Sequence, residues 1–286
     1  MQKIKWSNIP RGFAMGTSDL IPGVSGGTIA LLLGIYDDFI SSISGIFSKQ
    51  HFLKSLRFLI PIIIGMGIAL GLLSKLINYL LAEHHVVTMF FFLGLITGIV
   101  PFLLKESQFR IHFKAQHYVV IALGIIFIVV LTLFQGGDKH DVNTLALTPS
   151  STLIYLIAGI CASSAMLLPG ISGSFVLLLF GAYGTVMYAV SEMLSFNFQA
   201  LPLLLTVVAG VLIGFLASSR LIHYLLAHYT HMTYALIIGF VVGSLYAIFP
   251  GMPANGIEWL FVIITFIVGF CVSWLIGRQS HKQAAH

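Results

Sequence analysis

Long apolar runs alternate with short polar connections along the whole chain. Two runs, 12–47 and 152–190, are interrupted by proline, glycine and serine, and the other six are unbroken. A membrane-spanning helix needs about 20 apolar residues, which is close to the length of each unbroken run. The unbroken runs are 57–82, 86–104, 117–134, 200–227, 231–250 and 257–277. The pattern predicts an all-α polytopic membrane protein.

The two interruptions are nearly the same sequence. Residues 20–36 read "LIPGVSGGTIALLLGIY", and residues 167–183 read "LLPGISGSFVLLLFGAY". With 12–36 placed over 159–183, an offset of 147, 10 of 25 positions are identical. The matches include proline, glycine, serine and tyrosine in the same order, which a shared apolar composition does not produce by itself. We therefore interpret the two segments as copies of one motif.

A second match extends the duplication beyond the motif. Residues 75–98 align with 220–243 at an offset of 145, with 9 identities in 24 positions. The chain is therefore predicted to be a single membrane domain, 1–286, that contains two repeats. Repeat one covers 12–134 and repeat two covers 152–277.

The lysines and arginines predict how the repeats are oriented. If each broken segment crossed the membrane once, the basic loop 48–57 would lie opposite the basic N-terminus, against the positive-inside rule. If each is a re-entrant type of helical hairpin, the N-terminus, 48–57, 105–116 and the C-terminus all lie in the cytoplasm. Each repeat then holds one hairpin and three transmembrane helices. Because three is odd, the second repeat is inverted relative to the first, as in secondary transporters.

Composition agrees with a membrane protein and excludes several other classes. Hydrophobic residues make up 58% of the 286 positions, charged residues 8%, and the mean hydropathy is +1.02. The net charge of +5 comes from basic residues scattered among short loops, so no nucleic-acid-binding face is predicted. The two cysteines, Cys161 and Cys271, lie in separate apolar runs and indicate neither a disulfide nor a metal site.

The repeated motif has the chemistry of an anion site. Proline ends a helix and glycine permits the turn that follows, so the next helix restarts with free amides and its positive dipole end facing the turn. Such helix starts bind phosphates and carboxylates, and nearby hydroxyls add further donors. The other interpretation is a helix-packing notch made of small residues. The residues predicted to bind an anion are Ser25, Gly26, Gly27, Thr28, Ser172, Gly173 and Ser174.

Four charged residues could serve this site. Asp19, whose repeat counterpart is Met166, is an intramembrane carboxylate and a candidate for coupling to protons or sodium, or else a satisfied helix-end residue. Lys75 and Arg220 occupy matching repeat positions and could recruit phosphate, or could extend to the nearest headgroups. Arg11 precedes the first hairpin and could contact lipid phosphate or act only as a topology signal.

An enzyme is the less favoured interpretation. "GVSGG" also fits the G-x-S-x-G pattern of serine hydrolases, but that nucleophile elbow needs a strand, a turn and a helix. No strand pattern is present, and the histidines fall in loops, at the ends of spans or in the C-terminal tail, so none is predicted beside the serine. A transporter or channel for a small anion stays open as the alternative.

At these motifs the chain resembles the bacterial polyprenyl-phosphate transporter family. The resemblance implies a flippase that moves undecaprenyl phosphate from the outer to the cytoplasmic leaflet of the bacterial inner membrane, where it recycles the lipid carrier of cell-envelope synthesis. It implies undecaprenyl phosphate and membrane lipids as partners, with no cofactor, and leaves a homo-oligomer open. The second motif runs from Leu168 to Tyr183. The first is carried by Gly12, Gly16, Asp19, Pro22, Gly23, Val24, Ser25, Gly26, Gly27, Thr28, Ala30, Gly34 and Tyr36.

Overall fold

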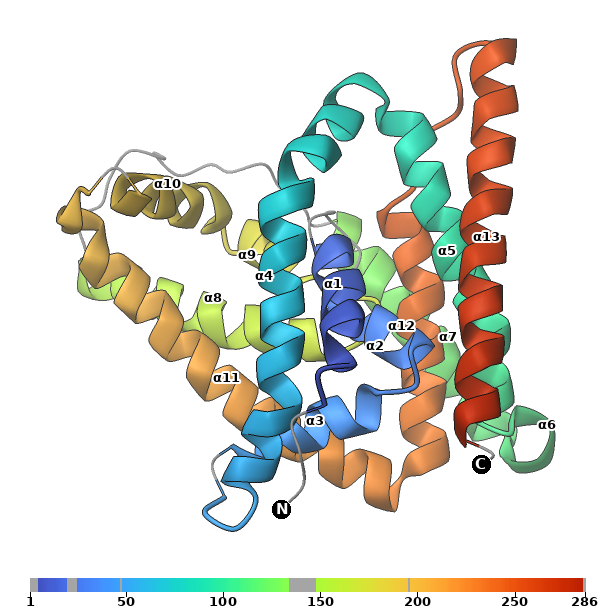
Figure 1. Ribbon diagram of the computed structural model, residues 1–286, viewed down its shortest axis with the longest axis horizontal. Coiled ribbons are helices and arrows are strands. Elements are labelled where there is room, and N and C mark those ends of the chain that lie inside the picture. The colour runs from blue at the N-terminus through green and yellow to red at the C-terminus, as the bar shows by residue number, and fades with distance from the viewer. Residues whose placement is uncertain (1–4, 20–24, 47, 134–147, 195, 285–286) are drawn as a thin grey trace.

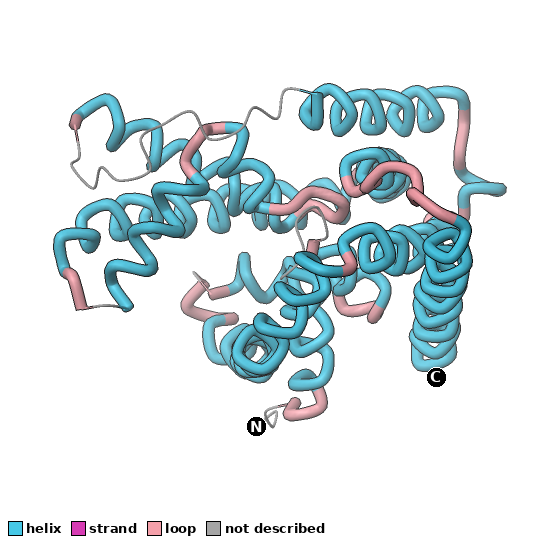
Figure 2. The backbone as a smooth tube through the Cα atoms, turned by 90° about the horizontal axis from the view of Figure 1, so that it is seen from above, coloured by secondary structure: helices cyan, strands magenta, loops and turns pink. Residues whose placement is uncertain are grey.

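The computed structural model describes residues 5–19, 25–46, 48–133, 148–194 and 196–284. These residues form helices joined by short loops, and no strand occurs among them (Figures 1 and 2). The helices are α1 (Asn8–Asp19), α2 (Gly26–Leu32), α3 (Tyr36–Gly45), α4 (Phe52–Glu83), α5 (His85–Glu106), α6 (Phe109–His112), α7 (Ala115–Leu133), α8 (Pro149–Leu167), α9 (Gly173–Leu179), α10 (Tyr183–Leu194), the 3-10 helix η1 (Phe198–Ala200), α11 (Leu201–His228), α12 (Thr230–Ala247) and α13 (Gly256–Ala284).

Seven of the described helices are long and apolar enough to cross a membrane. Six of them, α4, α5, α7, α11, α12 and α13, correspond to the six unbroken apolar runs. The seventh, α8, is the first part of the second broken segment, and it reaches this length because it begins further ahead of its proline than α1 does. The chain is therefore an all-helical, multi-pass membrane protein.

Apolar side chains on the outer faces of these helices fit a lipid environment. Leu72 on α4, Leu123 on α7 and Leu205 on α11 are each more than half exposed. Backbone polar groups in a bilayer core must be satisfied within the protein, which a helix does by itself while its side chains contact lipid. The spans are thus apolar on the outside as well as on the inside.

Each broken segment consists of three helical pieces, one more than the sequence predicts. The first is α1, α2 and α3, and the second is α8, α9 and α10. Beyond the break at the proline, a second break follows at Gly34 and at Gly181, where φ is +65° and +62°. Glycine adopts this left-handed backbone without a Cβ penalty, so it ends α2 and α9 at equivalent places.

Four helix pairs make the closest packing in the structure: α1 with α4, α8 with α11, α5 with α13, and α7 with α12. Glycines bring the backbones into direct contact, since a side chain at Gly12 would overlap the backbone of Ile62 and one at Gly159 would overlap that of Val207. Small residues at helix interfaces allow this approach in membrane proteins, where van der Waals contact is a main source of association.

Basic loops gather at one end of the molecule. In Figure 1 the first described residues, the start of α4, helix α6, the turn between α11 and α12 and the end of α13 all lie at the lower end. The turn between α4 and α5 and the loop between α12 and α13 lie at the upper end. These two ends are called the lower and upper ends below.

Candidate functional site

The start of α2 is held by two side chains of the first broken segment. The side chain of Ser25 caps the helix, because its Oγ accepts a hydrogen bond from the Gly27 amide at 3.1 Å. The Gly26 amide donates to Oδ1 of Asp19 at 2.7 Å. A carboxylate at a helix N-terminus is stabilised by the amide donors and by the helix dipole. Asp19 thus occupies the position that the sequence predicts for an anion.

The start of α9 has the same shape and different chemistry. Oγ of Ser172 and Oγ of Ser174 lie 3.1 Å apart, within hydrogen-bonding distance, and Ser172 is buried. A Cβ placed at Gly173 would lie 2.6 Å from Cγ and 2.9 Å from Sδ of Met166. The side chain of Met166 therefore lies against the start of α9, where Asp19 lies against the start of α2.

Hydrogen bonds join the two broken segments to each other. The Thr28 hydroxyl accepts from the Gly170 amide at 2.9 Å, and the Ser25 hydroxyl donates to the Met166 carbonyl at 3.4 Å. The buried hydroxyl of Tyr36 donates to the carbonyl of Leu167 at 2.8 Å. The predicted hydroxyls of the first motif therefore lie at the turn of the second motif, in a buried part of the molecule.

The predicted charge partners do not lie together. Arg220 is exposed, about two turns before the lower end of α11, whereas Lys75 lies on α4 about two turns before its upper end. The guanidinium of Arg11, on α1, donates to Oδ1 of Asn8 at 2.9 Å. The structure thus places Arg220 in the part of α11 towards the lower end and Lys75 in the part of α4 towards the upper end.

Two features of this region are not predicted from the sequence. One is the contact of the Tyr36 hydroxyl, although tyrosine recurs at the equivalent position in both motifs. The other is a cavity of about 660 Å³ at the lower end, which is lined by Lys5, Lys54 and Arg57, residues interpreted from the sequence only as topology signals. A signal for the cavity was present in the serines that recur between 41 and 55, which are frequent for so apolar a chain.

Acidic side chains lie beside this cavity, in the loops and helix ends of the lower end. Desolvation raises the pKa of Asp37, and the carboxylates of Glu106 and Asp38 raise it further, while His223 lowers it.

Within the part of the chain that the structure describes, no group of three histidine, cysteine, aspartate or glutamate side chains is arranged to hold a metal ion.

Comparison with known proteins identifies related chains over most of the sequence. The model of a family described as undecaprenyl phosphate translocase-like matches residues 15–259. A polyprenyl-phosphate transporter of Staphylococcus aureus is 61% identical over 278 residues, which cover 97% of this chain and 98% of that one. A polyprenyl-phosphate transporter of Vibrio cholerae is 35% identical over 256 residues, covering 84% and 76%. No solved structure matches the chain. Both relatives are named as transporters, in agreement with the prediction that the chain is not an enzyme.

Proposed function

Because this chain belongs to the undecaprenyl phosphate translocase-like family, we propose that it moves undecaprenyl phosphate from the outer to the cytoplasmic leaflet of the bacterial cytoplasmic membrane. The observation that carries this proposal is the match to a polyprenyl-phosphate transporter along almost the whole of both chains. In this role the protein returns the lipid carrier of cell-envelope polymers to the side where it is loaded again. The lower end, which carries the basic segments 48–57 and 105–116, faces the cytoplasm.

Transport of this kind rests on two inverted repeats. In Figure 1, α4 runs from the lower to the upper end while its counterpart α11 runs towards the lower end, and α5 and α12 are likewise opposed. A side chain at Gly94 would overlap Phe266, and one at Gly239 would lie 2.6 Å from the Ile121 carbonyl oxygen. Gly239 lies 145 positions after Gly94, and Ile121 lies 145 positions before Phe266. Each contact therefore joins the repeat counterparts of the two residues in the other contact. Reciprocal contacts of this type are those of a two-fold relation, which supports inversion.

The phosphate site lies where the two hairpins meet. Hydroxyls of Ser25, Thr28, Ser172 and Ser174 are brought to this region from both motifs, and each motif restarts a helix there. Hydroxyl and amide donors can bind a phosphate on either side of the junction while the polyprenyl chain stays in lipid. Arg11 and Arg220 at the lower side, and Lys75 at the upper side, recruit the phosphate from the two leaflets.

Asp19 couples phosphate binding to a cation. A phosphate oxygen and the Asp19 carboxylate are alternative acceptors for the Gly26 amide, which now donates to Asp19 at 2.7 Å. Hydrogen bonds to a charged acceptor are roughly twice as strong as those to a neutral one. Neutralising Asp19, by a proton or by a bound sodium ion, therefore releases the amide to the phosphate.

The experiment that tests the function measures undecaprenyl phosphate in the outer leaflet of cells that lack this protein and any redundant recycler. Accumulation of the lipid there, reversed by the wild-type gene, supports the proposal, and a normal amount of it contradicts the proposal. In proteoliposomes, uptake of inorganic phosphate without movement of the lipid would favour the small-anion transporter instead.

Serine substitutions test whether both hairpins act. Ser25→Ala and Ser172→Ala each remove one hydroxyl from the junction and are expected to reduce lipid transport by about fivefold to tenfold, the equivalent of about 1 kcal/mol for one hydrogen bond. Thr206→Ala is the matched control, since its hydroxyl bonds the Pro202 carbonyl within α11. A loss in one serine variant with none in the other would contradict a symmetric site.

A further inference from the structure

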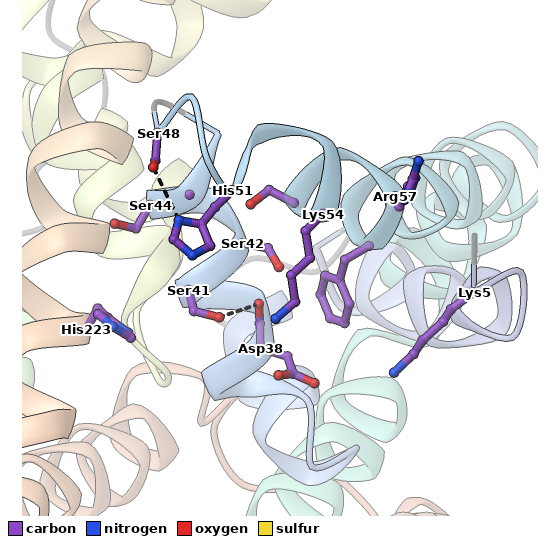
Figure 3. Close-up of a pocket in the computed structure, with 13 residues that line it drawn as sticks. Lys5, Asp38, Ser41, Ser42, Ser44, Ser48, His51, Lys54, Arg57 and His223 are labelled. Atoms are coloured by element: carbon purple, nitrogen blue, oxygen red, sulfur yellow. Dashed lines mark hydrogen bonds between the residues drawn. The ribbon is translucent and has the colours of Figure 1, made fainter. Parts of the chain in front are cut away.

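The cavity at the lower end is built from both halves of the chain. Its walls are α3, the loop and first turns of α4, Lys5 from the N-terminal segment and His223 from α11. Figure 3 shows Lys5, Lys54 and His223 approaching the same space from these separate elements. It lies apart from the hairpin junction, so it is not the site already described.

The charge of the lining favours an anion. Lys5, Lys54 and Arg57 bring three positive charges to the lining and Asp38 one negative charge, while the carboxylates of Asp37 and Glu106 lie beside the cavity and do not line it. A phosphomonoester carries about −1.5 to −2 charges near neutral pH. The cations of the lining can pair with such a ligand.

Hydroxyl donors accompany these charges. Five serines line the cavity, and two of them, Ser42 and Ser55, are buried with 9% and 3% of their surface exposed. Ser48 Oγ lies 3.2 Å from Nδ1 of His51, and Ser41 Oγ donates to the backbone carbonyl of Asp38 at 3.1 Å. Flexible ammonium groups together with hydroxyl donors form the kind of site that binds phosphate oxygens. An apolar ligand would desolvate the ammonium groups of this lining without pairing with them.

The second repeat does not reproduce this arrangement. At the offset of 145 that relates Gly65 to Gly210, Lys54 corresponds to Gln199 and Arg57 to Pro202. The cations of the cavity are therefore a feature of the lower end alone. The duplicated junction of the hairpins cannot account for them.

We propose that this cavity is a second phosphate site, which holds the phosphomonoester headgroup of the transported lipid at the lower face of the protein. The inference rests on the proposed function and adds a second binding site for the same substrate. Helix α3 connects the two sites, since it begins at Tyr36, bonded to Leu167 of the second hairpin, and its later residues line the cavity. A site on one face cannot by itself drive net transport. It gives that face a higher affinity for the substrate than the upper face has.

The test measures binding of two probes, farnesyl phosphate and inorganic phosphate, to the purified full-length protein in detergent. Lys54→Gln removes a cavity charge from an exposed side chain, and we expect about tenfold weaker binding of farnesyl phosphate, as the loss of one charge-assisted hydrogen bond gives. Lys49→Gln is the matched control, because Lys49 is exposed in the loop that precedes α4 and does not line the cavity. Lys54→Arg keeps the charge and should restore most of the affinity.

The two probes distinguish the source of the phosphate. Equal losses for both probes in Lys54→Gln mean that the cavity recognises phosphate alone, and a loss for farnesyl phosphate only means that it recognises the lipid-linked group. Each result supports a phosphate site. Farnesyl phosphate and inorganic phosphate binding by Lys54→Gln as tightly as by Lys49→Gln would overturn the inference, and Lys5→Gln repeats the test from a different element.

The transport assay separates this inference from the proposed function. If the wild-type protein moves undecaprenyl phosphate and Lys54→Gln binds both probes normally, the second site is wrong and the function stands. If the wild-type protein moves no lipid and Lys54→Gln still weakens the binding of either probe, the cavity is a phosphate site of a protein with another substrate. In that case the proposed function is wrong and the phosphate site in the cavity stands.

Discussion

The two broken segments share a backbone design and differ in the side chain that meets the restarted helix. In the first, the carboxylate of Asp19 accepts the Gly26 amide, and in the second, the side chain of Met166 lies against Gly173. Both restarts follow Pro-Gly-x-Ser-Gly. The two motifs therefore share the sequence of the turn and differ in its electrostatics.

Under the proposed function, this difference gives the two halves unequal tasks. An anion that approaches α2 competes with a carboxylate for the same amide, whereas no acidic residue takes that place at α9. We therefore expect phosphate binding at the first hairpin to be sensitive to the charge on Asp19, and binding at the second not to be.

The largest expected effect is a loss of stability when the junction of the two broken segments is disrupted in the second segment. Gly170 has φ +89°, and a Cβ there would lie 2.7 Å from the backbone of Phe240. Gly170→Ala should cost about 1–2 kcal/mol for the left-handed backbone and about 1–3 kcal/mol more for the overlap, seen as a fall in Tm of the purified protein. Gly251→Ala is the control, since its φ is +98° and the space around it is open. Equal falls in Tm would show that the overlap with Phe240 contributes nothing.

The next effect tests the difference between the hairpins directly. Asp19→Asn removes the charge that competes with phosphate for the Gly26 amide, so the phosphate binds without a cation and is released more slowly. We expect lipid transport to fall about tenfold to hundredfold, from the roughly 1.5–3 kcal/mol of a charged hydrogen bond. Met166→Leu keeps an apolar side chain at the equivalent place and should change transport by less than about twofold. Transport is measured in proteoliposomes with undecaprenyl phosphate. Equal transport rates in the two variants would remove the assigned asymmetry.

The smallest expected effect is the difference in stability between variants of the two equivalent tyrosines. Tyr36 is 3% exposed and donates to the Leu167 carbonyl, whereas Tyr183, its repeat counterpart, is only partly buried. Tyr36→Phe should lower stability by about 1 kcal/mol, because a buried carbonyl loses a hydrogen bond, and Tyr183→Phe should lower it by less. Thermal unfolding of both variants checks this order. A larger loss of stability in Tyr183→Phe would contradict it.

The sequence predicts much of the fold because the signals for it are local. Apolar length locates the six unbroken spans, and Pro22 and Pro169 mark the breaks in the other two segments, although residues 20–24 lie outside the described part of the chain. The further breaks at Gly34 and Gly181 were present in the aligned motifs but were not predicted, because a single glycine is common in membrane helices.

The candidate site could be predicted only in part. The pattern indicates that Ser25 and Thr28 serve a helix start, which Ser25 does as an N-cap. It cannot indicate that Asp19 takes up the Gly26 amide, since that contact depends on how the end of α1 is placed against the start of α2. The cavity at the lower end is harder still, because Lys5, Lys54 and His223 come together only through the packing of α3, α4 and α11.

Backbone contact at the glycines of α1 with α4, and of α8 with α11, has a mechanical result. At these glycines the helix backbones touch, so each hairpin and the span beside it pack tightly and are treated as one arm. The arms meet through hydrogen bonds, among them those from Gly170 to Thr28 and from Tyr36 to Leu167, and through apolar packing of α3 against α11. We therefore expect any relative motion to occur between the two arms, at the junction of the hairpins, and not within either arm.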